Sequence, residues 1–389
     1  MGIRAYENRY EHVNIELEEA LSLVKAHTGT IAETEEVPLS DALGRILAES
    51  VTADMDQPPF ARSPLDGYAL IAADTAGATK ENPARLTVAG RVVAGGVFDK
   101  KICRGQAVRI MTGAPISPGA DCVIRQEDTD WGEETVAVYR ELSACDNYCR
   151  AGEDFARGDL LLEAGTKIGA VELGILASAG TERVRVRRIP RVAVLTTGDE
   201  LVMPGEKRGP GKIYNSSLFV LAGRLRELGI EPAAGHLQDD EEAAAIRIKE
   251  LAEETDLILT AGGVSVGERD IMHGALAGLL ARPVFWRIRI KPGMPVIFSM
   301  VDKTSVLSLS GNPYGSFAHF EVLARPLLAH LTGCGQYGPQ RESAVMGEDF
   351  GKNTSVRRLV RGRVTSGIVS LPRGLHDSGV LGTTAGLPS

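Results

Sequence analysis

The sequence predicts a multidomain chain that combines an α/β domain built on a parallel sheet with β-rich domains. Two observations support this. The chain has 389 residues, which is too long for one ordinary hydrophobic core. Strand-like and helix-like segments alternate over residues 187–333, whereas short β-rich runs separated by glycine and proline fill residues 51–150.

Residues 187–333 supply the elements of the α/β domain. The expected strands are RVAVLTTG, EPAAGHL, DLILTAGG, VFWRIRI, PVIFSM and SVLSLSG. The expected helices are NSSLFVLAGRLRELG, DDEEAAAIRIKELAEET, IMHGALAGLL and the segment after NPYG. Asn215 or Ser216 is expected to cap the first of these helices, and Gly229 to end it. Such alternation favours a parallel sheet with helices on both faces, which binds ligands at the carboxyl ends of its strands.

The rest of the chain divides into four further segments. Residues 14–35 are expected to form a helix that packs on the α/β domain, with Asn14 as its N-cap. Residues 36–50, with a short helix capped by Ser40 or Asp41, are expected to join residues 151–186 in a small α+β domain. Residues 51–150 are then an inserted all-β domain, and the alternation in residues 334–389 predicts antiparallel strands.

Composition narrows the class of protein. The net charge is −8, from 43 basic and 51 acidic residues, which argues against a nucleic-acid-coating surface but permits a local anion pocket. No apolar run approaches the roughly 20 residues of a membrane span, and the first residues lack the apolar core of a signal peptide. The five cysteines have no spacing that completes a zinc site, so we expect reduced thiols in a cytoplasmic protein.

Three strand ends carry small residues and should meet at one edge of the sheet: VAVLTTGDEL, LILTAGGVSVGERD and VLSLSGNPYG. In the second, Gly262 and Gly263 let the backbone approach a ligand, and successive amides can form an anion-binding concavity. Ser265 adds a hydroxyl, and Asp270 can hold a metal ion or orient a phosphate-bound water. An ordinary glycine-rich turn explains the pattern equally well. Neither G-x-G-x-x-G nor G-K-[ST] is present, which disfavours a Rossmann or Walker site.

Acidic and basic residues follow other predicted strands. Asp199 and Glu200, like Asp239 and Asp240, are either helix-opening acids or ligands of Mg²⁺, which takes one or two carboxylates plus phosphate oxygens. Lys291 is either a phosphate counter-charge or an exposed turn residue. In the amino-terminal half, neither Asp66, in a possible Asp-Gly turn, nor Thr112, after a strand, indicates a site by itself.

Together these motifs resemble the MoeA family of molybdopterin molybdenumtransferases, of which the carboxyl domain of gephyrin is a relative. The matching strings occur in the family's order: SPLDGYAL, RIMTGAPISPGAD, RAGEDF, LTTGDEL, TAGGVSVGERD, IKPGMPV and SGNPYGSF. The resemblance implies a Mg²⁺-dependent transferase that inserts molybdenum from molybdate into adenylylated molybdopterin and releases AMP. It also implies a homodimer with the site in a cleft between subunits, and contacts with the molybdopterin adenylyltransferase and with apo-molybdoenzymes. The α/β domain would resemble that adenylyltransferase, and the carboxyl-terminal domain would be β-barrel-like.

Residue roles follow from the matching strings. The resemblance implies that Asp66 and Thr112 act from the inserted domain, and Glu200, Asp239, Asp270 and Lys291 from the α/β domain, with Asp239 and Asp270 holding Mg²⁺. Two loops would bind the pterin phosphates, and their residues are Gly262, Gly263, Ser265, Gly267, Ser310, Gly311, Asn312 and Pro313. Arg361 and Ser378 are expected to line the oxyanion pocket.

The chain departs from the family pattern near the expected site. Met294 replaces the second lysine of IKPGKP, and LSGNPYG replaces LPGNPVS, so that Ser310, Tyr314 and Gly315 differ. The carboxyl-terminal domain is also short. These departures leave two alternatives to a molybdenum insertase: an insertase-like enzyme for tungstate or a specialised cofactor, and a scaffold that binds the pterin without chemistry.

Overall fold

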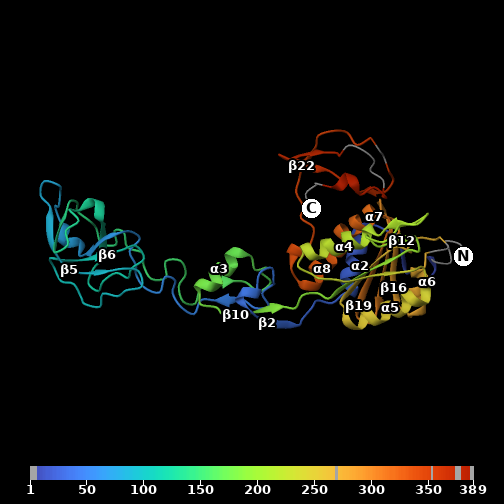
Figure 1. Cartoon of the computed structure of the whole chain (residues 1–389), viewed down its shortest axis with the longest axis horizontal. Helices are drawn as coiled ribbons and strands as arrows, with labels where there is room; N and C mark the ends of the chain where they lie inside the picture. Colours follow the sequence, from blue (N-terminus) through green and yellow to red (C-terminus); the bar gives the residue numbers. More distant parts are fainter. Residues whose placement is uncertain (1–6, 268–269, 352–353, 373–377, 386–389) are drawn as a thin grey trace. The chain divides into compact units, whose positions relative to one another are not determined.

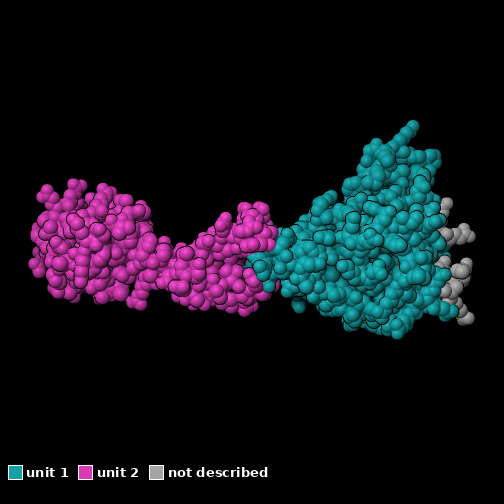
Figure 2. Space-filling model, turned by 90° about the horizontal axis from the view of Figure 1, so that it is seen from below, with its two compact units in different colours: residues 1–35, 44–48, 185–389 teal, residues 36–43, 49–184 magenta. Residues whose placement is uncertain are grey.

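The computed structural model describes residues 7–267, 270–351, 354–372 and 378–385, and the chain separates into two compact units. The first unit comprises residues 1–35, 44–48 and 185–389, and the second comprises residues 36–43 and 49–184 (Figure 2). The finer division into five segments stays a prediction.

A seven-stranded sheet is the centre of the first unit. Its order is β1-β16-β18-β19-β15-β11-β14. The strands are β1 (His12–Ile15), β11 (Val192–Thr197), β14 (Ala233–Leu237), β15 (Leu257–Ala261), β16 (Arg282–Ile288), β18 (Ile297–Val301) and β19 (Thr304–Leu309). All the strands predicted within residues 187–333 are present, and β15 and β19 are buried along their whole length.

The expectation of a wholly parallel sheet was wrong for one strand. β18 runs antiparallel to both of its neighbours, β16 and β19, whereas the other neighbouring strands pair in parallel. Val301 pairs with Thr304, so Asp302 and Lys303 form a two-residue connection. Such a connection closes a hairpin, since a parallel crossover needs about a dozen residues or more.

Helices cover both faces of this sheet (Figure 1). One face packs against α2 (Leu17–His27), α4 (Ser216–Glu227) and α8 (Arg325–Thr332), with a π-helical turn at Phe320–Ala324. The short helix α7 (Pro313–His319) contacts α4 and β19. The other face packs against α5 (Glu241–Glu254) and α6 (Met272–Gly278). The predicted cap of α4 is confirmed, because the Asn215 side chain accepts a hydrogen bond from the Leu218 amide. Of the two alternatives for Asp240, the structure supports the helix-opening acid, because its side chain accepts from the Ala243 amide.

Two predicted helix starts were wrong. Asn14 belongs to the edge strand β1 with a φ of 57°, and α2 begins only at Leu17, because residues 12–15 pair with β16. In PLSDALGRIL the structure has a 3₁₀ turn at Leu39–Asp41 with no side-chain cap. Gly44, at a φ of 77°, leaves the helical conformation soon afterwards.

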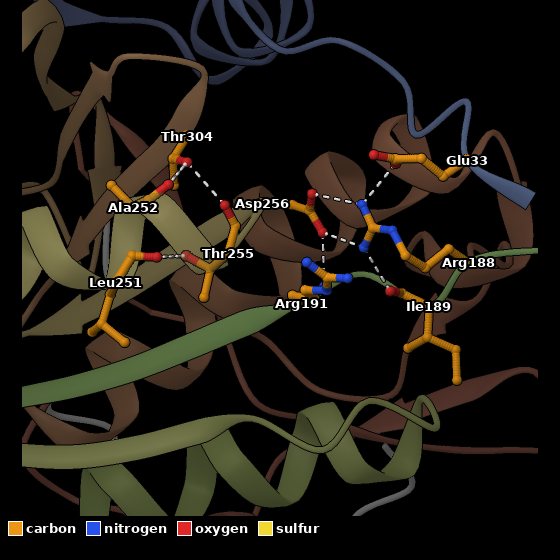
Figure 3. Close-up of polar contacts among 9 residues, drawn as sticks. All are labelled: Glu33, Arg188, Ile189, Arg191, Leu251, Ala252, Thr255, Asp256 and Thr304. Carbon is orange, nitrogen blue, oxygen red and sulfur yellow. Dashed lines mark hydrogen bonds and ion pairs between the residues drawn. The ribbon is translucent and has the colours of Figure 1, made fainter.

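A partly buried ion pair lies at the amino edge of the sheet (Figure 3). The Arg188 guanidinium donates to both carboxylate oxygens of Asp256, at 2.9 and 3.0 Å, and to Glu33 at 2.9 Å. The Arg191 amide donates to the same Asp256 carboxylate at 2.8 Å. The bonds to Asp256 raise the pKa of Arg188 above its ordinary value. This cluster ties the segment before β11 to the start of β15.

The second unit contains a five-stranded sheet in the order β7-β4-β6-β5-β8. Its strands are β4 (Gly67–Leu70), β5 (Ala84–Val92), β6 (Gln106–Ile110), β7 (Cys122–Arg125) and β8 (Thr135–Val138). Also in this unit, β3 (Val51–Thr52) pairs with β9 (Leu160–Leu162), which precedes α3 (Ala170–Ser178). The short β-rich runs therefore form strands, as the sequence predicts.

The carboxyl-terminal segment has short strands. β22 (Arg363–Thr365) and β23 (Ile368–Ser370) form the predicted antiparallel pair, and β20 (Val345–Met346) joins β23 in parallel. β21 (Arg357–Arg358) pairs with β17 (Ile290–Lys291) of the α/β region. Within the described residues this is a three-stranded sheet, and the expected barrel-like fold is not confirmed. No described helix is long and apolar enough to cross a membrane, and all five cysteines are free thiols.

Candidate active site

A cavity of about 960 Å³ opens at the carboxyl edge of the large sheet, where the ends of β11, β15 and β19 meet. The sequence-based expectation that these strand ends converge is therefore confirmed. The predicted residues that line it are Glu200, Asp239, Gly262, Gly263, Ser265, Asp270, Lys291, Ser310, Gly311, Asn312 and Pro313. Gly267 is not among the lining residues, and Asp66 and Thr112 belong to the other unit.

The glycine loop after β15 packs backbone against backbone. Gly262 and Gly263 have φ values of 114° and 64°, a region that glycine enters readily. A Cβ on Gly262 would lie 2.6 Å from the Thr197 carbonyl oxygen. A Cβ on Gly311 would lie 3.2 Å from the Gly262 Cα. The loops after β11, β15 and β19 are thus in direct backbone contact. This close packing explains why these strands end in small residues.

Two aromatic side chains hold the same loop from beneath. The Trp286 indole donates to the Val264 carbonyl at 3.2 Å, and His273 Nε2 lies 3.1 Å from the Ser265 carbonyl. A peptide N–H points opposite to the preceding carbonyl. The amides of Ser265 and Val266 therefore point away from Trp286 and His273. Within the described part of the chain, no group accepts a hydrogen bond from either amide, which suits binding of an anion.

His273 is neutral near neutral pH, because burial lowers its pKa to about 4. Its Nδ1 lies 2.9 Å from the Tyr10 hydroxyl. A carbonyl can only accept, so Nε2 carries the proton toward Ser265 and Nδ1 accepts from Tyr10. Sequence reasoning missed this support, because Tyr10 and His273 lie far apart along the chain and belong to no common motif.

The acidic residues at the cavity are tied to its loops. The Asp239 amide donates to the Asp199 carboxylate at 3.1 Å, and the Asp199 amide donates to the Asp239 carboxylate at 3.3 Å. The Asp270 carboxylate accepts from the Gly267 amide. No group of three or more His, Cys, Asp or Glu side chains that could hold a metal ion occurs within the described ranges. Carboxylates of Asp239 and Asp270 nevertheless fit Mg²⁺, whose coordination is usually completed by water and substrate phosphates.

Basic residues reach the cavity from paired strands. Lys291 of β17 lies opposite Arg358 of β21 in the register, and both line the cavity. Arg358 has no motif in the sequence, and it is brought to the site only by this pairing. Ser378 lines the cavity as expected and accepts a hydrogen bond from the Asn312 side chain at 2.9 Å. Arg361 instead is buried, with its guanidinium 3.7 Å from the centre of the Tyr314 ring.

Asp66 and Thr112 are brought together in the second unit. The Thr112 amide and hydroxyl both donate to one Asp66 carboxylate oxygen, at 2.7 and 2.8 Å. These two bonds hold the pKa of Asp66 below its ordinary value. The pair therefore presents an ionised carboxylate.

Comparison with known proteins identifies the family. Residues 15–180 match the MoeA N-terminal region (domain I and II), and residues 193–330 match a probable molybdopterin binding domain. The chain is 35% identical over 349 residues to the molybdopterin molybdenumtransferase of Staphylococcus epidermidis, covering 89% of this chain and 83% of that protein. The chain belongs to the molybdopterin molybdenumtransferase family. This membership places it in molybdenum cofactor biosynthesis.

Solved structures agree with this membership. A molybdopterin biosynthesis MoeA protein from Pyrococcus horikoshii OT3 is 30% identical with a TM-score of 0.81, covering 95% of this chain and 92% of that one. A second structure of a MoeA protein from this organism is 31% identical with a TM-score of 0.78, covering 92% and 89%. The likeness extends over both compact units.

Proposed function

We propose that the chain transfers molybdenum from molybdate to adenylylated molybdopterin and releases AMP, with Mg²⁺ as cofactor. The cavity at the carboxyl edge of the sheet is the observation that supports this most directly. It combines the glycine loop with two basic side chains, Lys291 and Arg358, and three carboxylates, Glu200, Asp239 and Asp270. A substrate that carries a phosphoanhydride and a metal ion needs both signs of charge in one pocket.

The position of these residues at the cavity supports the following proposed roles. The Ser265 amide, with Lys291 and Arg358, binds the phosphates and stabilises the charge that develops when the anhydride breaks. Asp239 and Asp270 would hold Mg²⁺, which supplies charge neutralisation at the phosphate oxygens when bound. Two dithiolene sulfurs replace two oxygens of molybdate, which leave with the two thiol protons as hydroxide. Water attacks the phosphoanhydride and AMP is the leaving group, so no protein nucleophile is required. Positioning of the two substrates supplies most of the rate effect.

Further parts of the proposal rest on the family resemblance. We propose that the chain is a cytoplasmic homodimer and that Asp66 and Thr112 take part in the reaction. The ionised Asp66 carboxylate and the Thr112 hydroxyl are chemically suited to bind a polar substrate.

The direct test is an assay with purified protein, adenylylated molybdopterin, molybdate and Mg²⁺. Molybdenum cofactor and AMP are expected to appear together, and omission of Mg²⁺ is expected to stop both. Pterin binding without AMP release would instead identify a scaffold. The same assay with molybdate and tungstate in competition separates a molybdenum insertase from a tungstate enzyme.

Met294 lines the cavity at the position where the resemblance leads us to expect a lysine. This difference is the reason to test tungstate as well as molybdate. Met294→Lys is expected to tighten molybdate binding about 3- to 10-fold, since a charged donor near an oxyanion contributes roughly 1 kcal/mol in a partly exposed position. Calorimetric titration with molybdate and with tungstate measures this. Met294→Gln is the uncharged control, and equal affinities of the Lys and Gln variants would show that the oxyanion lies elsewhere.

A further inference from the structure

His319 of α7 lies directly behind the cavity and engages the backbone of two of its loops. The residue has no solvent exposure. Its Nδ1 accepts a hydrogen bond from the Ser310 amide at 3.2 Å, and its Nε2 bonds to the Gly293 carbonyl oxygen. Ser310 and Gly293 both line the cavity, on the turns that carry Asn312 and Lys291.

These two partners define the proton position on the ring. An amide N–H can only donate and a carbonyl can only accept, so Nδ1 must be unprotonated and Nε2 must carry the proton. The neutral tautomer satisfies both groups, whereas the imidazolium would direct a second N–H at the Ser310 amide. Burial agrees with this, because it lowers the pKa of His319 to about 4.

The ring also fills the space behind the lysine turn. Gly293 has a φ of 96°, and a Cβ on it would overlap the imidazole of His319. Backbone and ring are therefore in direct contact, so the Lys291–Met294 turn cannot move toward α7 while the ring is present.

The departures from the family pattern in SGNPYG fit this arrangement. A proline at position 310 would have no amide hydrogen to donate to His319. A Cβ on Gly315 would lie 2.8 Å from the Ser310 hydroxyl oxygen, so glycine at 315 leaves room for that hydroxyl. Serine at 310 thus provides the amide hydrogen that His319 accepts, and glycine at 315 leaves room for the serine side chain.

We propose that His319 is a positioning residue whose neutral ring holds the Lys291–Met294 turn and the Ser310–Pro313 turn at the spacing that the anionic substrate requires. His319 contacts no substrate itself and acts through the two turns. The inference rests on the proposed function for the identity of the substrate, but its structural part concerns the two backbone bonds alone.

Three variants separate the two bonds. His319→Asn retains an acceptor near Nδ1 for the Ser310 amide, His319→Gln retains a donor near Nε2 for the Gly293 carbonyl, and His319→Leu retains neither. The matched control is His330→Gln on α8, whose Nε2 bonds to the Thr28 carbonyl at 2.8 Å outside the cavity lining.

Two measurements are made on each folded variant, with AMP as the probe ligand. Hydrogen exchange of the Ser310 amide is expected to stay slow in the wild type and in His319→Asn, and to accelerate at least ~10-fold in His319→Gln and His319→Leu. Calorimetric titration is expected to show AMP binding about 5-fold weaker in the Asn and Gln variants and roughly 30-fold weaker in the Leu variant, as one or two backbone bonds are lost. His330→Gln is expected to bind AMP within about 2-fold of the wild type.

The outcomes are distinguishable. If His319→Leu binds AMP like the wild type while only its melting temperature falls, the ring stabilises the fold and positions nothing, and the proposal is wrong. If Leu alone fails to fold, the ordering of the Asn and Gln variants decides, and unchanged AMP binding in both would overturn the proposal. If the wild type itself does not bind AMP, the proposed function fails, and the exchange pattern of Ser310 still decides whether His319 holds the turn.

Discussion

Asp270→Ala is expected to lower the rate of molybdenum cofactor formation by roughly 100-fold or more, the size of effect seen when a preorganised electrostatic group is removed from an active site. Two losses contribute. The carboxylate lines the cavity and is a proposed Mg²⁺ ligand. It also accepts a hydrogen bond from the Gly267 amide and so shapes the glycine loop. Alanine removes both the charge and the acceptor.

Asp270→Asn separates these contributions. Asparagine keeps an oxygen that can accept from the Gly267 amide but has no charge for a cation. A metal-binding role predicts that Asn is nearly as inactive as Ala and that raising Mg²⁺ partly restores the Ala variant's rate. A loop-shaping role predicts that Asn retains most of the wild-type rate. The measurement is AMP release against Mg²⁺ concentration.

Asp240→Asn is the matched control, because Asp240 is an acid in the same region that does not line the cavity. Its side chain caps α5 by accepting from the Ala243 amide, and asparagine caps as well as aspartate. Its rate should equal that of the wild type. Full activity of Asp270→Ala would remove Asp270 from the mechanism.

The meeting of β11, β15 and β19 at the carboxyl edge of the sheet could be predicted, because it follows from local sequence patterns. Each strand was visible as an apolar run, and strand–helix alternation forces parallel strands to end at one edge. The reversal of β18 was missed because Asp302 and Lys303 do not have the usual composition of a hairpin turn. The start of α2 was missed because Asn14 is a good cap in isolation, whereas pairing with β16 determined its conformation.

The supporting residues of the site could not be predicted, since long-range packing selects them. Arg358 reaches the cavity through a strand pair with β17, and the two strands are far apart along the chain. Tyr10, His273 and Trp286 converge beneath the glycine loop from three different elements. His319 stands in the mostly buried helix α7 and belongs to none of the motifs that indicate the site. Motifs therefore identify groups that can meet the ligand, but not the side chains that hold those groups in place.

Asp256→Ala is expected to lower the free energy of unfolding of the first unit by about 2 kcal/mol, between the values for an exposed and for a fully buried ion pair. The Arg188 side chain is 16% exposed and that of Asp256 is 22% exposed. Alanine would leave the Arg188 guanidinium without both bonds to Asp256, and the Arg191 amide without its acceptor. A charged donor left partly buried costs more than the bonds themselves contribute.

The protein's two tryptophans allow this to be measured on one unit. Trp131 lies in the second unit and is 49% exposed, whereas Trp286 is fully buried in the first. In a Trp131→Phe background, fluorescence during urea unfolding reports on Trp286 and hence on the first unit, which avoids treating two units as one transition. The midpoint should shift to lower urea without a change of slope.

Glu33→Ala is the matched control, because Glu33 bonds to the same Arg188 guanidinium but its side chain is 66% exposed. An exposed partner of this kind contributes about 0–1 kcal/mol. The Arg188–Asp256 pair lies at the amino edge of the sheet and the cavity at the carboxyl edge, so AMP binding by the folded Asp256→Ala protein should match the wild type. Equal destabilisation by the two alanine variants would mean that the cluster acts as a surface pair. Weakened AMP binding by folded Asp256→Ala would show that fixing the amino edge also sets the spacing of the loops at the opposite edge.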